Sequence, residues 1–237
     1  MAQSQTAKPK PAERSGPEAL RDRILEAALP HVPFDGWGRK ALLQGAKDIG
    51  LGADEVARVF SGSAVEMIEH HSRMADRKMT AALAEMELPS MKMRNRIRTA
   101  IQIRLEQNAR DREAVQRALA VLALSHNAVA GARLLYKTVD AIWYAAGDTA
   151  TDFSFYSKRG LLAGVYSSTL LYWLNDNSEG FADTLAFLDR RIDNVMNMPR
   201  FSGRLKAVTD AVPNPFRIVR GLGRRRRRHF GPGVSRS

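Results

Sequence analysis

The side chains best suited to acid–base or metal chemistry cluster within one short stretch of the sequence. They are Glu66, Glu69, His70 and His71. Glu66 and His70 are four residues apart and would share one face of a helix. A di-iron helical bundle needs a Glu-x-x-His pair on each of two helices and two further glutamates, but the residue three positions after Glu66 is Glu69. The pattern therefore favours a solvated polar helix face over a metal site.

Other catalytic motifs are missing from the sequence. It contains no cysteine, which excludes disulfide scaffolds, cysteine-ligated zinc modules, iron–sulfur clusters and thiol nucleophiles. It contains neither a G-x-S-x-G elbow nor an H-E-x-x-H zinc motif. The Gly50-Leu51-Gly52 stretch lacks the third glycine of a dinucleotide-binding loop, so it predicts a turn. We therefore expect a protein that is not an enzyme and that uses neither a cofactor nor a metal.

The densest aromatic region lies between Trp143 and Trp173. Within it, Phe153 and Tyr156 would share a helix face, whereas Phe155 would point elsewhere. One interpretation is aromatic packing inside a helical hairpin. The other is a protein-binding patch at the start of a helix, because aromatic side chains are enriched at interaction hot spots. The residues by themselves leave both interpretations open.

The net charge of +12 is concentrated in the C-terminal tail. Residues 15–199 hold 23 basic and 23 acidic side chains, whereas residues 200–237 hold 11 basic residues against the single carboxylate of Asp210. The body of the protein is therefore neutral, and a partner attracted by charge alone would be a partner of the tail.

Helical periodicity continues through most of the chain after a polar leader at residues 1–16, which we expect to be disordered. No convincing period-2 run appears, so the predicted fold class is all-α. Nine helices are predicted within one domain, 17–199, at about 17–30, 39–49, 53–60, 64–87, 91–108, 112–124, 129–146, 152–175 and 180–197. The segment between the first two is expected to be a loop. No signal peptide is evident, which indicates a cytoplasmic protein.

The first three predicted helices have the lengths and the glycine turn of a helix-turn-helix head, a motif that places a helix in the DNA major groove. Here the third helix carries Asp54 and Glu55 against Arg58. Two carboxylates at this position would face the DNA phosphates. The sequence therefore predicts the head without its DNA chemistry.

The tail, residues 200–237, combines an amphipathic segment with a run of arginines. Apolar side chains at spacings of 4, 3 and 4 would form one stripe of a membrane-surface helix. They are Phe201, Leu205, Val208 and Val212. Attraction to an anionic membrane would come from Arg224, Arg225, Arg226, Arg227 and Arg228. The alternatives are a disordered basic tail and a tail that binds RNA or the ribosome.

Several stretches of the sequence resemble the coenzyme Q (ubiquinone) biosynthesis accessory family of lipid-binding proteins. The resemblance covers about residues 18–200 and is carried by Trp143–Phe153, Tyr156–Tyr166, the Asp176-Asn177-Ser178 turn, Phe187–Met196 and Arg23–Pro33. It implies a fold like that of the TetR regulators without their DNA function. It also implies an isoprenoid lipid held in the helical body, docking on the di-iron demethoxyubiquinone hydroxylase, and membrane association through a C-terminal amphipathic helix.

The resemblance also implies which residues would serve these roles. The hydroxylase-docking patch would include Ile142, Asp152, Phe155 and Tyr156. Animal members of the family have tryptophan where this chain has Phe155, so the aromatic character is kept. The apolar helices expected at 91–108, 129–146 and 152–175 would hold the lipid through Ile97, Ile101, Leu105, Leu135, Val139, Leu162, Val165, Tyr166, Leu170 and Trp173.

These observations together predict an accessory protein that binds a ubiquinone precursor at the membrane and presents it to the demethoxyubiquinone hydroxylase. A polyprenyl chain is almost insoluble in water, and each CH₂ group that is buried contributes about 0.8 kcal/mol. We expect a homodimer, by analogy with TetR-like bundles, that associates peripherally with the inner membrane. The alternative is a TetR-type DNA-binding transcriptional regulator with a hydrophobic ligand pocket.

Overall fold

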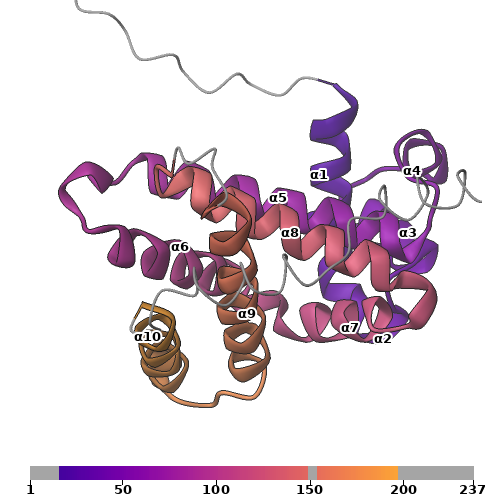
Figure 1. Ribbon diagram of the computed structural model, residues 1–237. Coiled ribbons are helices and arrows are strands. Elements are labelled where there is room, and N and C mark those ends of the chain that lie inside the picture. The colour runs from indigo at the N-terminus through magenta and orange to yellow at the C-terminus, as the bar shows by residue number, and fades with distance from the viewer. Residues whose placement is uncertain (1–15, 149–153, 197–237) are drawn as a thin grey trace, which may run out of the picture. The chain divides into compact units, whose positions relative to one another are not determined.

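The computed structural model describes residues 16–148 and 154–196, and this part of the chain is helical without any β-strand (Figure 1). Its α-helices are α1 Pro17–Ala28, α2 Val32–Asp35, α3 Arg39–Asp48, α4 Ala53–Val59, α5 Ala64–Ala84, α6 Met93–Gln107, α7 Arg112–Leu122, α8 Ala128–Ala145, α9 Ser154–Trp173 and α10 Ala182–Met196. The all-α prediction is confirmed, and every predicted helix is present. Residues 1–15 of the predicted leader lie outside the described residues, as do residues 197–237, which include the whole predicted tail.

One short helix was missed by the sequence prediction. The segment expected to be a loop forms α2, a single turn that begins at Val32. Pro33 is the second residue of this turn, a position where the missing N–H of proline costs no helical hydrogen bond. Val32 is fully buried, so tertiary packing stabilises a turn that is too short to show periodicity.

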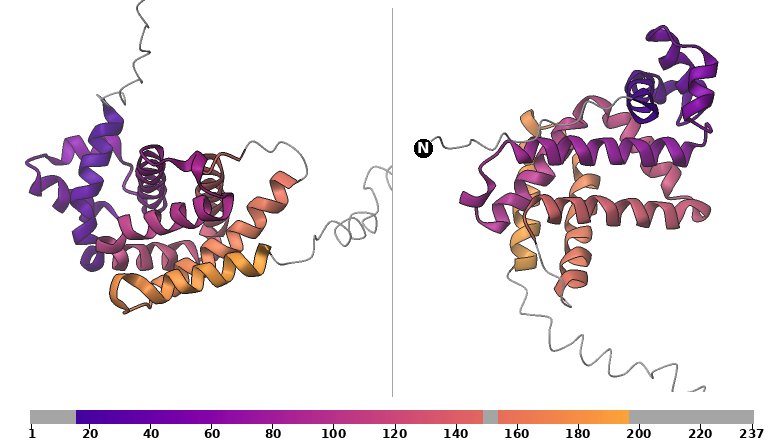
Figure 2. Two further views of the ribbon diagram at one scale, coloured as in Figure 1. Left: turned by 90° about the vertical axis from the view of Figure 1, so that its left-hand side faces the viewer. Right: turned by 90° about the horizontal axis from the view of Figure 1, so that it is seen from above.

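The N-terminal helices α1, α3 and α4 share one hydrophobic core, to which they contribute Leu25, Leu42 and Val56. The right view of Figure 2 shows these helices gathered beside one end of α5. The close approach of α1 and α3 depends on Gly45, because a Cβ atom at this position would lie 2.4 Å from the backbone nitrogen of Ala28.

The remaining helices form the body of the bundle. The long helix α5 packs on α6 and α8, and α8 packs on α9. Figure 1 shows α5 and α8 side by side, with α9 crossing them. Tyr172 of α9 stacks on Phe187 of α10, with ring centroids 4.6 Å apart. The last helix is therefore joined to the bundle by aromatic contact.

Within the described ranges, no single helix is both long enough and apolar enough to cross a membrane. Residues 109–122 and 125–145 meet that criterion only as a pair, and the pair is bent by 96°. Helices α7 and α8 therefore meet at a sharp corner, and each directs one of its faces to the interior of the bundle.

Replacing Gly45 with alanine is expected to destabilise the protein by about 1–3 kcal/mol, because the added methyl group meets the backbone of α1. The matched change is Gly160→Ala in the exposed part of α9, where a Cβ atom would meet nothing within 4 Å. That variant should gain up to about 1 kcal/mol, since alanine is the better helix former. Urea unfolding measures both, and equal effects would contradict the close-approach argument.

Candidate functional site

A cavity of about 510 Å³ lies inside the bundle, bounded by residues of α5, α6, α7, α8 and α9. This volume is within the range of small-molecule binding sites, about 300–1,000 Å³. One wall is the inner face of α7, where Val115, Ala118, Leu119 and Leu122 follow the i, i+3, i+4, i+7 pattern of a single helix face. The apolar side chains of α7 therefore form a wall of the cavity and leave empty space between α7 and the helices opposite.

Small side chains on α8 leave this space open. Ala128, Gly131 and Ala132 line the cavity near the corner between α7 and α8, and a Cβ atom added at Gly131 would touch only Leu122. Ala128 and Ala132 are also exposed to solvent, as is Leu171 on α9. The rim of the cavity is therefore apolar, a suitable entrance for an apolar ligand.

A buried polar cluster forms the opposite wall. Arg104 of α6 lines the cavity and is only 5% exposed. Its Nε lies 2.8 Å from Oδ1 of Asp76 on α5, and its Nη2 donates to Ser72 Oγ at 3.3 Å. Thr138 of α8 donates its hydroxyl to Asp76 Oδ2 at 3.2 Å. Three helices thus converge on one ion pair, and burial raises the pKa of the Asp76 carboxyl despite the nearby guanidinium.

Two further titratable side chains in the lining are neutral at physiological pH. Burial lowers the pKa of His71 to about 3, and the positive charge of Arg104 adds to this effect. The His71 ring packs against Trp37, with centroids 5.5 Å apart. Burial also raises the pKa of Tyr166. The cluster therefore carries one positive and one negative charge, which sum to zero.

The structure separates the predicted lipid-binding residues into two groups. Leu105, Leu135, Tyr166, Leu170 and Trp173 line the cavity. The others are buried in the helix–helix core and do not contribute to the described lining: Ile97, Ile101, Val139, Leu162 and Val165. For these five, the assignment as lining residues is corrected to core residues, because an apolar stripe has the same pattern whether it faces a neighbouring helix or a cavity.

The contribution of α7 to the lining was not anticipated from the sequence. The i, i+3, i+4, i+7 spacing of the apolar residues in α7 could have revealed this contribution. Arg104 was missed as well, although it lies three residues after Ile101, on the apolar stripe of α6. A charged residue in an apolar stripe indicates a buried, paired charge.

The predicted docking patch is only partly described. Tyr156 is 71% exposed at the start of α9, as a docking residue would be. Ile142 is fully buried, so its assignment to a docking surface is corrected to a core position. Asp152 and the side chain of Phe155 lie outside the described residues, as do the predicted membrane-binding residues Phe201, Leu205, Val208, Val212 and Arg224–Arg228.

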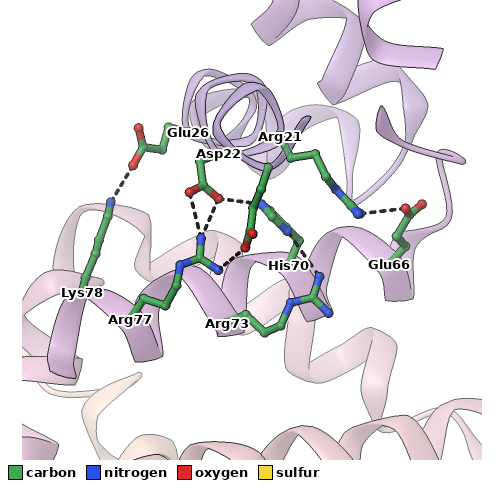
Figure 3. Close-up of polar contacts among 9 residues, drawn as sticks. Arg21, Asp22, Glu26, Glu66, His70, Arg73, Arg77 and Lys78 are labelled. Atoms are coloured by element: carbon green, nitrogen blue, oxygen red, sulfur yellow. Dashed lines mark hydrogen bonds and ion pairs between the residues drawn. The ribbon is translucent and has the colours of Figure 1, made fainter. Parts of the chain in front are cut away.

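The cluster at Glu66–His71 is not the solvated face that the sequence indicated (Figure 3). His70 is 1% exposed, and its Nε2 lies 2.7 Å from Asp22 Oδ1 on α1. Arg77 donates from Nη2 to both oxygens of Asp22, at 2.7 and 2.8 Å. Within residues 16–148 and 154–196, no group of three potential ligands could hold a metal ion. The cluster instead joins α1 to α5 by charge pairs.

Comparison with known proteins relates this structure to a family. The COQ9 family model matches residues 128–199. The human protein "Ubiquinone biosynthesis protein COQ9, mitochondrial" is 35% identical over 212 residues, covering 86% of this chain and 64% of its own length. COQ9-B of Xenopus laevis is 33% identical over 202 residues, covering 82% of this chain and 69% of its own length. This chain thus spans just under two thirds of the human relative.

A solved structure shows the same fold. The TetR transcriptional regulator from Nitrosomonas europaea superposes with a TM-score of 0.62 at 22% sequence identity, covering 75% of this chain and 98% of the regulator. The TetR-like fold prediction is thereby confirmed.

Replacing Asp22 with asparagine is expected to destabilise the protein by about 2 kcal/mol, because Arg77 and buried His70 then lose their shared carboxylate. The matched control is Glu26→Gln, which breaks the pair between Glu26 and Lys78, in which both side chains are about half exposed. This change should cost less than about 1 kcal/mol. Denaturant unfolding of both variants checks the difference, and a small effect of Asp22→Asn would show that the charge pairs do not stabilise the contact between α1 and α5.

Acid is expected to destabilise the protein through His71. The unfolded chain takes up a proton on this residue below about pH 6.5, whereas the folded protein does so only near pH 3. Between these values the free energy of unfolding should fall by up to about 1.4 kcal/mol per pH unit. His71→Phe should flatten this slope, and His126→Phe, at an exposed position, should not. Identical slopes in the wild type and both variants would refute the assignment.

Proposed function

Since the chain belongs to the COQ9 family of ubiquinone biosynthesis proteins, we propose that it acts in ubiquinone biosynthesis as a lipid-binding accessory protein. Its ligand would be an isoprenoid lipid, a ubiquinone precursor, held in the cavity that the five helices α5 to α9 surround. The cavity is the observation that carries this proposal, because it combines an apolar wall, an apolar rim and a buried polar cluster.

The two ends of such a ligand match the two kinds of wall. An isoprenoid chain placed against Leu119, Leu122 and Leu135 would gain about 0.8 kcal/mol for each CH₂ group removed from water. An oxygen-bearing ring placed near Arg104 and Tyr166 would find hydrogen-bond donors that are already buried. A ligand longer than the cavity would leave through the apolar rim.

Presentation to the demethoxyubiquinone hydroxylase is the second part of the proposal. Tyr144 in the last turn of α8 is 78% exposed, and Tyr156 follows in the first turn of α9. Exposed aromatic side chains at two adjoining helix ends suit a protein interface. We expect the hydroxylase to dock at Tyr144 and Tyr156, and the predicted docking residues Asp152 and Phe155 lie between these two in the sequence.

Peripheral membrane association is the third part, and its support comes from the sequence. The apolar stripe from Phe201 to Val212 and the run Arg224–Arg228 suit a segment that lies on an anionic surface. We propose that this segment holds the protein, as a homodimer, on the inner membrane. The role assigned to the chain includes no catalytic step of its own.

The DNA-binding alternative has less support than lipid binding. In α4, Arg58 Nη2 lies 2.9 Å from Glu55 Oε1, and Asp54 is exposed beside it. The helix that would enter a DNA groove thus has its arginine neutralised by a carboxylate. Attraction to phosphates is correspondingly weak.

Filling the cavity is expected to remove the lipid. Leu170→Trp adds bulk to the lining, whereas Leu161→Trp adds the same bulk at a 41% exposed position of the same helix. Mass spectrometry of organic extracts should find isoprenoid lipid in the wild type and in Leu161→Trp, and at least about tenfold less in Leu170→Trp, because the occupied volume is lost. Wild-type extracts equal to those of a control protein would refute lipid binding.

A further inference from the structure

Arg104 places a positive charge in the lining of a largely apolar cavity. It is the only permanently charged side chain among the described lining residues, and it is 5% exposed. An arginine in an apolar cavity is ordinarily a site for a carboxylate or phosphate. By itself, it would suggest that the ligand is a fatty acid or another anionic lipid.

Asp76 removes that attraction. It does not belong to the lining but lies behind Arg104, with its Oδ1 2.8 Å from Arg104 Nε. The hydroxyl of Thr138 donates to its other oxygen, which fixes the carboxylate in place. A second anion brought to Arg104 would enter a site of low polarity that already contains a negative charge, and such like-charge contacts are strongly unfavourable.

The remaining polar groups of the cavity are rich in donors. The guanidinium has five N–H bonds; Nη2 donates to Ser72 Oγ, whereas Nε lies 2.8 Å from Asp76 Oδ1 as an ion pair without hydrogen-bond geometry. Trp173 also lines the cavity and is fully buried, and its Nε1 has no hydrogen-bond partner in the described part of the chain. A buried donor without a partner is costly, so a ligand oxygen that accepts from it is favoured.

We propose that the Asp76–Arg104 pair makes the cavity selective for uncharged lipids that carry oxygen acceptors, and that Asp76 is the positioning residue that excludes free carboxylates. This inference rests on the proposed function, since it names the ligand class of the same cavity. Hydroxyl, carbonyl and ether oxygens satisfy the donors without adding charge. A carboxylate of the same chain length does not.

Two probes of equal chain length test the proposal, farnesol and farnesoic acid. Binding of each to delipidated full-length protein is measured by titration calorimetry at pH 7.5, where the acid is ionised. The wild type should bind farnesol at least about tenfold more tightly than farnesoate. In Asp76→Asn the asparagine oxygen can still accept from Arg104, but the charge of Arg104 is no longer balanced. This variant should gain at least about tenfold in affinity for farnesoate.

Two controls separate charge from structure. Asp140→Asn breaks the pair between Asp140 and Arg159, in which Asp140 is 45% exposed, and should leave both affinities unchanged. The double variant Asp76→Asn with Arg104→Gln removes both charges and should not gain farnesoate affinity. If Asp76→Asn alone fails to fold, the double variant is compared with the wild type instead. Because the charges near the cavity sum to zero in both proteins, both should show the same ratio of farnesol affinity to farnesoate affinity.

Each result supports or overturns a specific statement. Equal affinity of the wild type for farnesol and farnesoate would overturn the inference and leave the lipid-binding function standing. No gain of farnesoate affinity in folded Asp76→Asn would overturn the role of Asp76. Absence of binding of either probe, together with lipid-free extracts, would overturn the proposed function itself.

Discussion

The ion pair between Asp76 and Arg104 constrains three of the helices that surround the cavity, α5, α6 and α8. Removing two charges from water costs several kcal/mol for each ion, and the cost is offset only when geometry and additional hydrogen bonds are good. Here α5 supplies Asp76 and Ser72, α6 supplies Arg104, and α8 supplies Thr138. Since separating the partners would leave an unpaired buried charge, these three helices hold a fixed register. The positions of α5, α6 and α8 around the cavity are therefore fixed at the buried Asp76–Arg104 pair.

A second set of charges joins the N-terminal helices to α5. Asp22 on α1 accepts from Arg77 and pairs with His70, while Arg21 Nη2 donates to Glu66 Oε1 at 2.8 Å. These contacts span three turns of α5 but come from adjacent residues of α1, so they fix the point at which α1 crosses α5 (Figure 3). The head thus retains the TetR-like arrangement for structural reasons, although its α4 lacks the surface charge that DNA binding requires.

Periodicity predicted every helix except the single turn α2, but it did not predict the empty space between the helices. An apolar stripe such as Ile97, Ile101 and Leu105 predicts a buried helix face, and all three residues are buried. The pattern contains no information on what the face meets, so Ile101 was placed in the cavity while it lies in the core. Buried polar residues were predicted to be exposed, because their partners lie far away in the sequence. His70 looked like a surface residue, because its partner Asp22 is 48 positions earlier in the sequence and no local pattern links the two.

The described cavity lining begins at Ile68 and ends at Trp173, and none of it comes from α1 to α4 or from α10. The cavity and the N-terminal head therefore draw on different helices but meet in one hydrophobic core, because Ile68 of α5 lines the cavity and also packs in the core that contains Leu25 and Leu42. A change of side chain on the outer surface of the head would leave the cavity lining as it is, whereas a change at Ile68 or His71 would reach the lining and the packing of the head at the same time.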